Sequence, residues 1–151
     1  MKAIRELLVD RSAPLTRPGS ESALDAARAM QESGVGALLV TGPDGRLAGI
    51  FTERDVMTRI LVAGRDAART PLNEVMTRQI YFCSPEQRIG EVARELQARH
   101  VRHLPVVEDG RVVGLLSLRD ILREYLADAR HEVDVLTAYI QGEGEGRPTS
   151  L

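Results

Sequence analysis

The chain has 151 residues, of which 43% are apolar and 28% charged, and this composition is typical of a globular protein that buries its own core. The net charge of −2 gives no electrostatic reason to expect a nucleic acid or an anionic membrane as partner, and an aromatic content of 3% argues against base stacking. Cys83 is the single cysteine, which excludes an internal disulfide and fits a reducing cytoplasm, where we expect the protein to reside.

The first third of the chain predicts a short helix, a polar lead-in segment and an amphipathic helix, in that order. Ala3–Val9 is the short helix, and it is too charged to be a secretion signal. Thr16-Arg17-Pro18 is the lead-in segment. The amphipathic helix is predicted because apolar residues recur at helical spacing, at Ala23, Ala26, Ala27 and Met30.

Two strands and another helix follow. Ala37–Val40 is apolar throughout and predicts a buried strand. Gly45 serves the turn after it, and Arg46–Phe51 is predicted to return antiparallel. The next helix is indicated by an apolar stripe of Val56, Met57, Ile60 and Leu61.

The second half begins with a linker and then repeats this order. Thr70–Met76 predicts a short helix with Thr70 as N-cap and Pro71 at its first position. The second lead-in segment is Cys83-Ser84-Pro85, in which we expect Cys83 to be a small buried strand residue. Its amphipathic helix carries Ile89, Val92, Ala93 and Leu96.

The strands of the second half are Leu104–Val107 and Arg111–Leu116, joined at Asp109-Gly110, a hairpin turn that needs positive φ. The helix after them carries Ile121, Leu122, Tyr125 and Leu126. Helix is predicted to continue through Ala127–Gln141, with Val133, Leu136 and Ile140 on one side. Gly142–Leu151 is predicted to be a disordered tail.

The two halves are a duplication, covering residues 16–57 and 83–122, with a period of about 65 residues. Ala27 aligns with Ala93, and after a one-residue gap at the turn Gly49 aligns with Gly114. The chain is therefore an α/β (α+β) protein of two βαββα-type units packed face to face, plus a C-terminal helix. We divide it into repeat 1 (1–65, with the N-terminal helix), repeat 2 (66–128, with the linker helix), a C-terminal helix (129–141) and the tail (142–151).

Each copy ends on the same signature, Gly49–Asp55 in the first and Gly114–Asp120 in the second. Thr52 with Asp55, and Ser117 with Asp120, have the spacing of a helix capping box, which stabilises a helix by about 1 kcal/mol. The alternative is a ligand site, since a glycine before the hydroxyl permits close approach, and an acid can accept ribose hydroxyls. Arg54 and Arg119 could attract a phosphate. The recurrence of the whole set in both copies favours the site.

The two copies resemble a tandem cystathionine-β-synthase (CBS) domain pair, or Bateman module, of the small stand-alone bacterial type. The resemblance rests on "SGVGALLVTGPDGRLAGIFTERDV", "RHVRHLPVVEDGRVVGLLSLRDI" and the "EVMT" linker, and covers about residues 1–128. It implies units that pack through their sheets with pseudo-twofold symmetry, leaving two related clefts. Such clefts bind adenosine compounds: AMP, ADP, ATP, S-adenosylmethionine or NAD, with Mg²⁺ accompanying ATP.

The resemblance also implies roles for particular residues. Asp55 and Asp120 would accept ribose hydroxyls, and Thr52 and Ser117 would contact ribose or phosphate. The remaining ligand-binding candidates are the two signature arginines, Arg54 and Arg119; the segments flanking the adenine, Val35, Gly36 and Ala37 in one copy and Val101, Arg102 and His103 in the other; and the lead-in residues Thr16 and Ser84. Because Gly36-Ala37 is replaced by Arg102-His103, we expect the two clefts to differ in charge and occupancy. Arg102 is the better phosphate ligand, while His103 could equally be a packed strand residue.

The sequence supports two functions of different class. The first is a regulatory adenine-nucleotide sensor, a homodimer that changes conformation with its ligand and acts on an unidentified partner protein. The second is a structural homodimerisation module with vestigial clefts, joined through the helices that follow the signatures. No catalytic triad, carboxylate pair or phosphate-binding glycine loop is present, so we expect no enzyme activity, and three scattered histidines predict no metal site.

Overall fold

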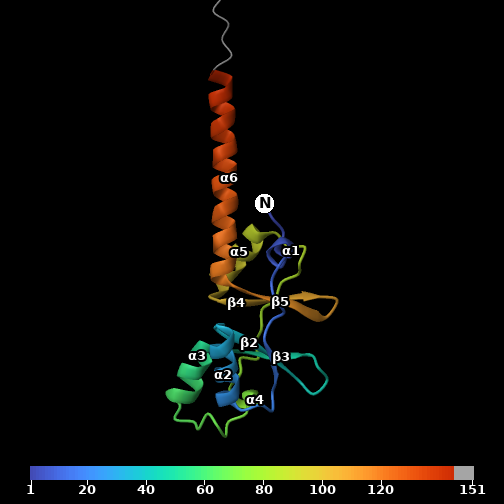
Figure 1. Cartoon of the computed structure of the whole chain (residues 1–151), viewed down its shortest axis with the longest axis vertical. Helices are drawn as coiled ribbons and strands as arrows, with labels where there is room; N and C mark the ends of the chain where they lie inside the picture. Colours follow the sequence, from blue (N-terminus) through green and yellow to red (C-terminus); the bar gives the residue numbers. More distant parts are fainter. Residues whose placement is uncertain (145–151) are drawn as a thin grey trace, which may run out of the picture.

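The computed structural model describes residues 1–144. Two small α/β units lie one above the other, and the last helix, α6 (Leu118–Gly144), rises from the upper unit and extends well past it (Figure 1). Within the described part of the chain, no helix combines the length and the apolar character needed to cross a membrane.

The lower unit is built on a three-stranded sheet. β1 (Thr16–Pro18) pairs parallel with β2 (Ala37–Thr41), which pairs antiparallel with β3 (Leu47–Thr52). The predicted amphipathic helix is α2 (Ala23–Ser33), and its buried residues Ala23, Ala26 and Met30 confirm the predicted face. After β3 the chain turns directly into α3 (Glu53–Asp55) and a π-helical segment, η1 (Val56–Leu61).

The upper unit repeats this plan with a smaller sheet. α5 (Ile89–Arg99) is followed by the antiparallel pair β4 (His103–Glu108) and β5 (Arg111–Ser117). Asp109 and Gly110 have φ values of 50° and 75°, which confirms the predicted hairpin turn. Cys83 forms a parallel bridge to Val106 in place of a third strand and is buried, as predicted.

The two short helices are exchanged between the units. α1 (Ile4–Leu7), at the start of the first repeat, places Ile4 and Leu7 in the core of the upper unit. α4 (Leu72–Val75), in the linker before the second repeat, places Leu72 and Val75 in the core of the lower unit. Each core is therefore completed by a helix from outside its own repeat, which ties the two repeats together.

The two sheets pack against each other, as predicted. Ala37, Leu39 and Ile50 of the lower sheet are buried with Val112 and Leu115 of the upper sheet. The other face of β2 points into the lower core through Leu38 and Val40. Because β2 is covered on both faces, its sequence is apolar throughout and does not alternate.

Two local predictions differ from the structure, at the N-cap of α4 and at the end of α6. The N-cap of α4 is Pro71 and not Thr70, whose hydroxyl instead donates a hydrogen bond to the Asp66 carbonyl at 2.7 Å. As predicted, helix continues from the second signature through Ala127–Gln141, and both parts form one helix, α6, because no helix breaker separates them. α6 extends to Gly144, so the predicted disordered tail is wrong for residues 142–144; its remainder, 145–151, lies outside the described residues.

Candidate functional site

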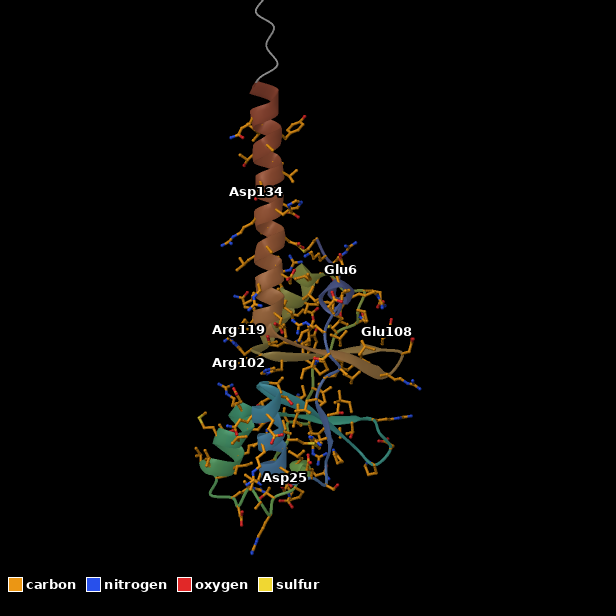
Figure 2. The ribbon with its side chains drawn as sticks, viewed as in Figure 1. Glu6, Asp25, Arg102, Glu108, Arg119 and Asp134 are labelled. Atoms are coloured by element: carbon orange, nitrogen blue, oxygen red, sulfur yellow. The ribbon has the colours of Figure 1, made fainter. Side chains whose placement is uncertain are left out.

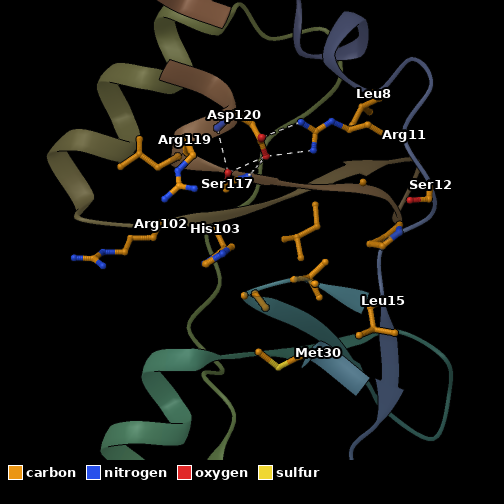
Figure 3. Close-up of a pocket in the computed structure, with 18 of the residues that line it drawn as sticks. Leu8, Arg11, Ser12, Leu15, Met30, Arg102, His103, Ser117, Arg119 and Asp120 are labelled. Carbon is orange, nitrogen blue, oxygen red and sulfur yellow. Dashed lines mark hydrogen bonds and ion pairs between the residues drawn. The ribbon is translucent and has the colours of Figure 1, made fainter. Parts of the chain in front are cut away.

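An open cleft of about 1690 Å³ lies between the two units, at the point where α6 begins. It is larger than the roughly 300–1,000 Å³ of a typical small-molecule pocket, so a nucleotide would fill part of it. Figure 3 shows Ser117, Arg119 and Asp120 on its upper side and Leu15 and Met30 across from them. Both repeats therefore contribute to the site.

Asp120 is the central acid of the cleft. Its Oδ2 accepts hydrogen bonds from the Ser117 amide at 2.9 Å and the Ser117 hydroxyl at 2.8 Å, and the Asp120 amide donates back to that hydroxyl at 3.1 Å. These contacts form the capping box that the spacing predicted. Its Oδ1 faces the Arg11 guanidinium, 3.0 Å away. Burial alone would raise the pKa of Asp120, but hydrogen bonds from Arg11 and Ser117 outweigh burial and lower the pKa to about 2.

Four arginines line the same cleft: Arg11, Arg102, Arg119 and Arg123. Arg11 pairs with Asp120, whereas the other three form no ion pair with any acid in residues 1–141. Arg102 and Arg119 lie at the base of α6, where the two units meet (Figure 2). The cleft therefore offers exposed guanidinium groups beside a carboxylate, an arrangement suited to a phosphorylated sugar.

His103, the first residue of β4, lines the cleft. A Cβ atom added to Gly36 would lie 3.7 Å from His103 Nε2 and 3.3 Å from a Glu53 carboxylate oxygen, so Gly36 keeps the space between these two side chains open. Burial lowers the pKa of His103, with Arg102 adding to the effect and Glu53 and Asp120 opposing it. His103 is therefore a lining residue and not merely strand packing.

The corresponding place in the first repeat is filled by the chain itself. Asp55 is only 5% exposed. Its Oδ2 accepts from the Thr52 amide at 3.0 Å and hydroxyl at 3.1 Å, its Oδ1 accepts from the Thr77 hydroxyl at 3.1 Å, and Arg59 lies 3.4 Å from Oδ1. Both carboxylate oxygens are satisfied by protein groups, as they are in Asp120, but the Asp55 side chain is 6% exposed against 21% for Asp120, so little of Asp55 is left for a ligand.

Asp55 and Asp120 differ in their surroundings because different residues occupy two equivalent positions of the repeats. Thr77 and Arg11 lie 66 residues apart, and each contacts the signature acid of the unit that its short helix completes. Thr77 also pairs through its backbone with Ile50, at 2.8 and 2.9 Å, which closes the segment onto β3. The Arg11 amide donates to the Leu8 carbonyl and not to β5, and both Arg11 and Asp120 line the open cleft.

The glycine of each signature admits this same chain segment. A Cβ atom on Gly49 would lie 2.5 Å from the Met76 sulfur, and one on Gly114 would lie 2.5 Å from Leu8 Cδ2. Any side chain would therefore push the neighbouring segment away. The close approach expected at these glycines is real, and the group that approaches is the protein's own chain.

Eight of the sequence candidates line the cleft: Val35, Gly36, Ala37, Arg102, His103, Ser117, Arg119 and Asp120. The other six do not line it: Thr16, Thr52, Arg54, Asp55, Ser84 and Val101. Arg54 is exposed, while Val101 packs against the upper core. Sequence reasoning missed Arg11, Glu53 and Arg123, because Arg11 and Thr77 lie outside the two repeated segments and no local pattern marks them.

The family model described as the CBS domain matches the chain twice, over residues 5–62 and 72–127. The chain belongs to the CBS-domain family. A curated relative of this CBS-domain chain is the mitochondrial CBS domain-containing protein CBSX3 of Arabidopsis thaliana, which is 34% identical over 126 residues, or 81% of this chain. The chain spans 61% of the length of that relative and 26% of the next plant relative.

Solved CBS structures have the same fold. A putative signal-transduction protein with CBS domains from Burkholderia ambifaria superposes with a TM-score of 0.77 at 29% identity, covering 84% of this chain and 96% of that one. A CBS domain pair solved in complex with 5′-methylthioadenosine and S-adenosyl-L-methionine superposes with a TM-score of 0.74, covering 85% of this chain and 98% of that one. Because its identity to this chain is 24%, the second structure shows only that the two proteins share a fold.

Proposed function

We propose that this chain is a regulatory adenine-nucleotide-binding module that works in the cytoplasm, without catalysis, on a partner protein. The carrying observation is the cleft at Asp120, which both repeats line and which sets a carboxylate among four arginines. Membership of the CBS family supports a ligand-binding regulatory role. AMP or ATP is the proposed ligand, because a phosphate satisfies guanidinium groups that S-adenosylmethionine would leave unpaired.

Asp120 would hold the ribose. Arg11 contacts both of its carboxylate oxygens, so a ribose that donates both hydroxyls to the carboxylate takes over the place of the guanidinium. Arg11 is then free to join Arg102, Arg119 and Arg123 around the phosphates. The exchange replaces the ion pair of Asp120 by hydrogen bonds from neutral hydroxyls, while Arg11 turns to the negative charge of the ligand.

Ligand binding would be transmitted through α6. The first turn of this helix carries Arg119 and Asp120, and its next turns carry Leu122 and Leu126, which also line the cleft. The opposite wall belongs to the other repeat. A nucleotide that contacts both walls binds more tightly to one relative orientation of the two units than to others. The population of that orientation rises in proportion to this difference in affinity.

The first cleft would not bind, since Asp55 is already satisfied by Thr52, Thr77 and Arg59. We therefore propose one nucleotide per chain, although the duplication provides two signatures. Calorimetric titration measures this stoichiometry directly.

A thermal-shift panel of AMP, ADP, ATP with and without Mg²⁺, S-adenosylmethionine, 5′-methylthioadenosine and NAD tests the proposal. At about 100 times Kd, a one-site ligand stabilises the fold by about 2.7 kcal/mol, which raises the melting temperature by about 5–10 °C. Inorganic phosphate alone is the control, because an anion without ribose cannot use Asp120. A panel with no shift would overturn the proposal.

The alternative function is a structural homodimerisation module with vestigial clefts. It is favoured by the apolar side chains that α6 exposes beyond the domain, including Val133, Leu136 and Ile140. The two functions separate in the same panel, because a vestigial cleft gives no shift with any adenosine compound.

His103 is expected to make the fold less stable on acidification. Burial holds its pKa in the folded state below the usual 6.5, so the unfolded chain takes up a proton first as pH falls. Its effect is absent above about pH 6.5, and below that value stability decreases until the lowered pKa is passed. Melting temperatures from about pH 7.5 to about pH 5.5 should fall more for the wild type than for His103→Gln. Equal losses would contradict this role.

A further inference from the structure

The Arg11 side chain occupies the part of Asp120 that faces the cleft. Its guanidinium lies 3.0 Å from Oδ1 and donates to Oδ2 at 3.2 Å, so it contacts both carboxylate oxygens. Figure 3 shows Arg11 extending toward Asp120 from the segment that follows α1. The Arg11 side chain is 40% exposed, so the pair lies within reach of a ligand in the cleft. A group that binds Asp120 from the cleft must therefore first displace this guanidinium.

The backbone around Arg11 allows such a displacement. Arg11 lies in a segment without helix or strand, and its amide donates to the Leu8 carbonyl at 3.3 Å. Residues 12–14, which follow it along the wall of the cleft, form no backbone hydrogen bond with any residue of 1–144. The equivalent Thr77 is instead paired with Ile50 through two backbone hydrogen bonds, at 2.8 and 2.9 Å. Arg11 can leave its acid without disturbing a sheet, whereas Thr77 cannot.

A displaced Arg11 finds little new charge on the side of α1. A hollow of about 270 Å³ meets the cleft at Arg11, and two acids line it, Glu6 and Glu124. Glu124 already pairs with the Lys2 ammonium at 3.0 Å, and Glu6 already accepts the backbone amide at the N-cap of α1 at 2.8 Å. The hollow therefore does not replace the ion pair that Arg11 would lose.

The acids of the cleft offer little more. Asp10 is exposed, and an ion pair in water contributes little. Glu53 belongs to the first repeat, and it lies with His103 around Gly36. A ligand that carries its own anion therefore brings the strongest new partner for Arg11.

We propose that Arg11 makes the cleft selective for phosphorylated adenosine compounds, because it competes with the ribose for Asp120. The inference rests on the proposed function of the cleft. Adenosine and 5′-methylthioadenosine must break the ion pair and leave the guanidinium without a partner. A nucleotide breaks the same ion pair but offers a phosphate, which a guanidinium binds with two parallel hydrogen bonds. One side chain thus opposes uncharged ligands and supports charged ones.

Replacing Arg11 with methionine should change the two classes of ligand in opposite directions. Adenosine should bind about two- to fivefold more tightly, because no partly exposed ion pair has to be broken. AMP should bind more weakly, because the variant lacks the contact with its phosphate. The broken ion pair is common to both ligands and cancels in their ratio, so the preference for AMP over adenosine should fall by about tenfold or more. Calorimetric titration of both ligands measures these changes.

The matched control is Arg123→Met, which removes another guanidinium that lines the cleft but that pairs with no acid in residues 1–141. It should weaken AMP without tightening adenosine. Equal tightening of adenosine in both variants would overturn the proposal, since the gain would then reflect a general loss of positive charge. Arg11→Lys is a second variant that keeps the charge but loses the planar two-point contact, so it should tighten adenosine with a smaller loss of AMP.

Two further outcomes separate this inference from the proposed function. If the wild type binds AMP and Arg11→Met binds adenosine no more tightly than the wild type, the competition by Arg11 is overturned and the nucleotide site stands. If neither protein binds any adenosine compound, the proposed function is overturned and the inference falls with it. The melting temperature of ligand-free Arg11→Met should lie within about 5 °C of the wild type, which shows that the variant is folded.

Discussion

Replacing Asp120 with asparagine is expected to weaken adenine-nucleotide binding by roughly 30- to 150-fold. A hydrogen bond to a charged group contributes about 2–3 kcal/mol, and 1.4 kcal/mol corresponds to a factor of ten. The pKa of Asp120, about 2, keeps the carboxylate ionised at neutral pH, so it is the charged form that would accept the ribose hydroxyls. An asparagine side chain still accepts from Ser117 and preserves the start of α6, but it loses the charge and one acceptor oxygen. Calorimetric titration with the ligand identified in the thermal-shift panel measures the loss.

The matched control for Asp120→Asn is Asp55→Asn, the same change at the equivalent position of the first signature. It should leave the nucleotide affinity and the stoichiometry unchanged, because Asp55 does not line the cleft. Equal losses of affinity in the two variants would contradict a single working cleft. Full affinity in the Asp120→Asn and Asp55→Asn double variant would show that both signatures serve only as helix caps.

Replacing Asp55 with alanine is expected to destabilise the fold by about 2–4 kcal/mol, which lowers the melting temperature by about 5–15 °C. The substitution removes the acceptor of the Thr52 amide, and it leaves the Thr77 hydroxyl and the Arg59 guanidinium without their buried partner. It also weakens the attachment of residue 77 to the lower unit, on which the exchange of α4 depends.

Thermal unfolding measures the effect of Asp55→Ala. Glu32→Ala, at an exposed position of α2, is the control and should change the stability by less than about 0.5 kcal/mol. A loss of under about 1 kcal/mol for Asp55→Ala would mean that its cap is the only contact that matters. That result would contradict the assignment of a structural role to Asp55 and a ligand-binding role to Asp120.

The secondary structure was predictable because it depends on local patterns. The spacing of Ala23, Ala26 and Met30 specifies the buried face of α2, and the pair Asp109-Gly110 specifies a hairpin turn by its tolerance of positive φ. The capping hydrogen bonds between Ser117 and Asp120 were predictable for the same reason, since both residues lie in one turn of chain. The fold class followed from the duplication of these local units.

The candidate site was predictable only in part. The signature at Asp120 was found because it recurs in both copies, and the segments around Gly36 and His103 were found through the resemblance to the CBS pair. Arg11 was missed because its role depends on a contact 109 residues away. The predicted N-cap at Thr70 was wrong for a similar reason. The Thr70 hydroxyl donates to the Asp66 carbonyl, and the local sequence does not specify the turn that brings these two groups together.

The two units, their strands and helices, the two signatures and the stripe of Val133, Leu136 and Ile140 on α6 could be predicted without the structure, because each depends on residues close together in the chain. Tertiary structure alone decided which signature opens onto a cleft. The exchange of α1 and α4 brings Arg11 to Asp120 and Thr77 to Asp55. Thr77 pairs with β3, whereas Arg11 lines the open cleft. The two signature acids differ in exposure because the chain segments packed against them differ.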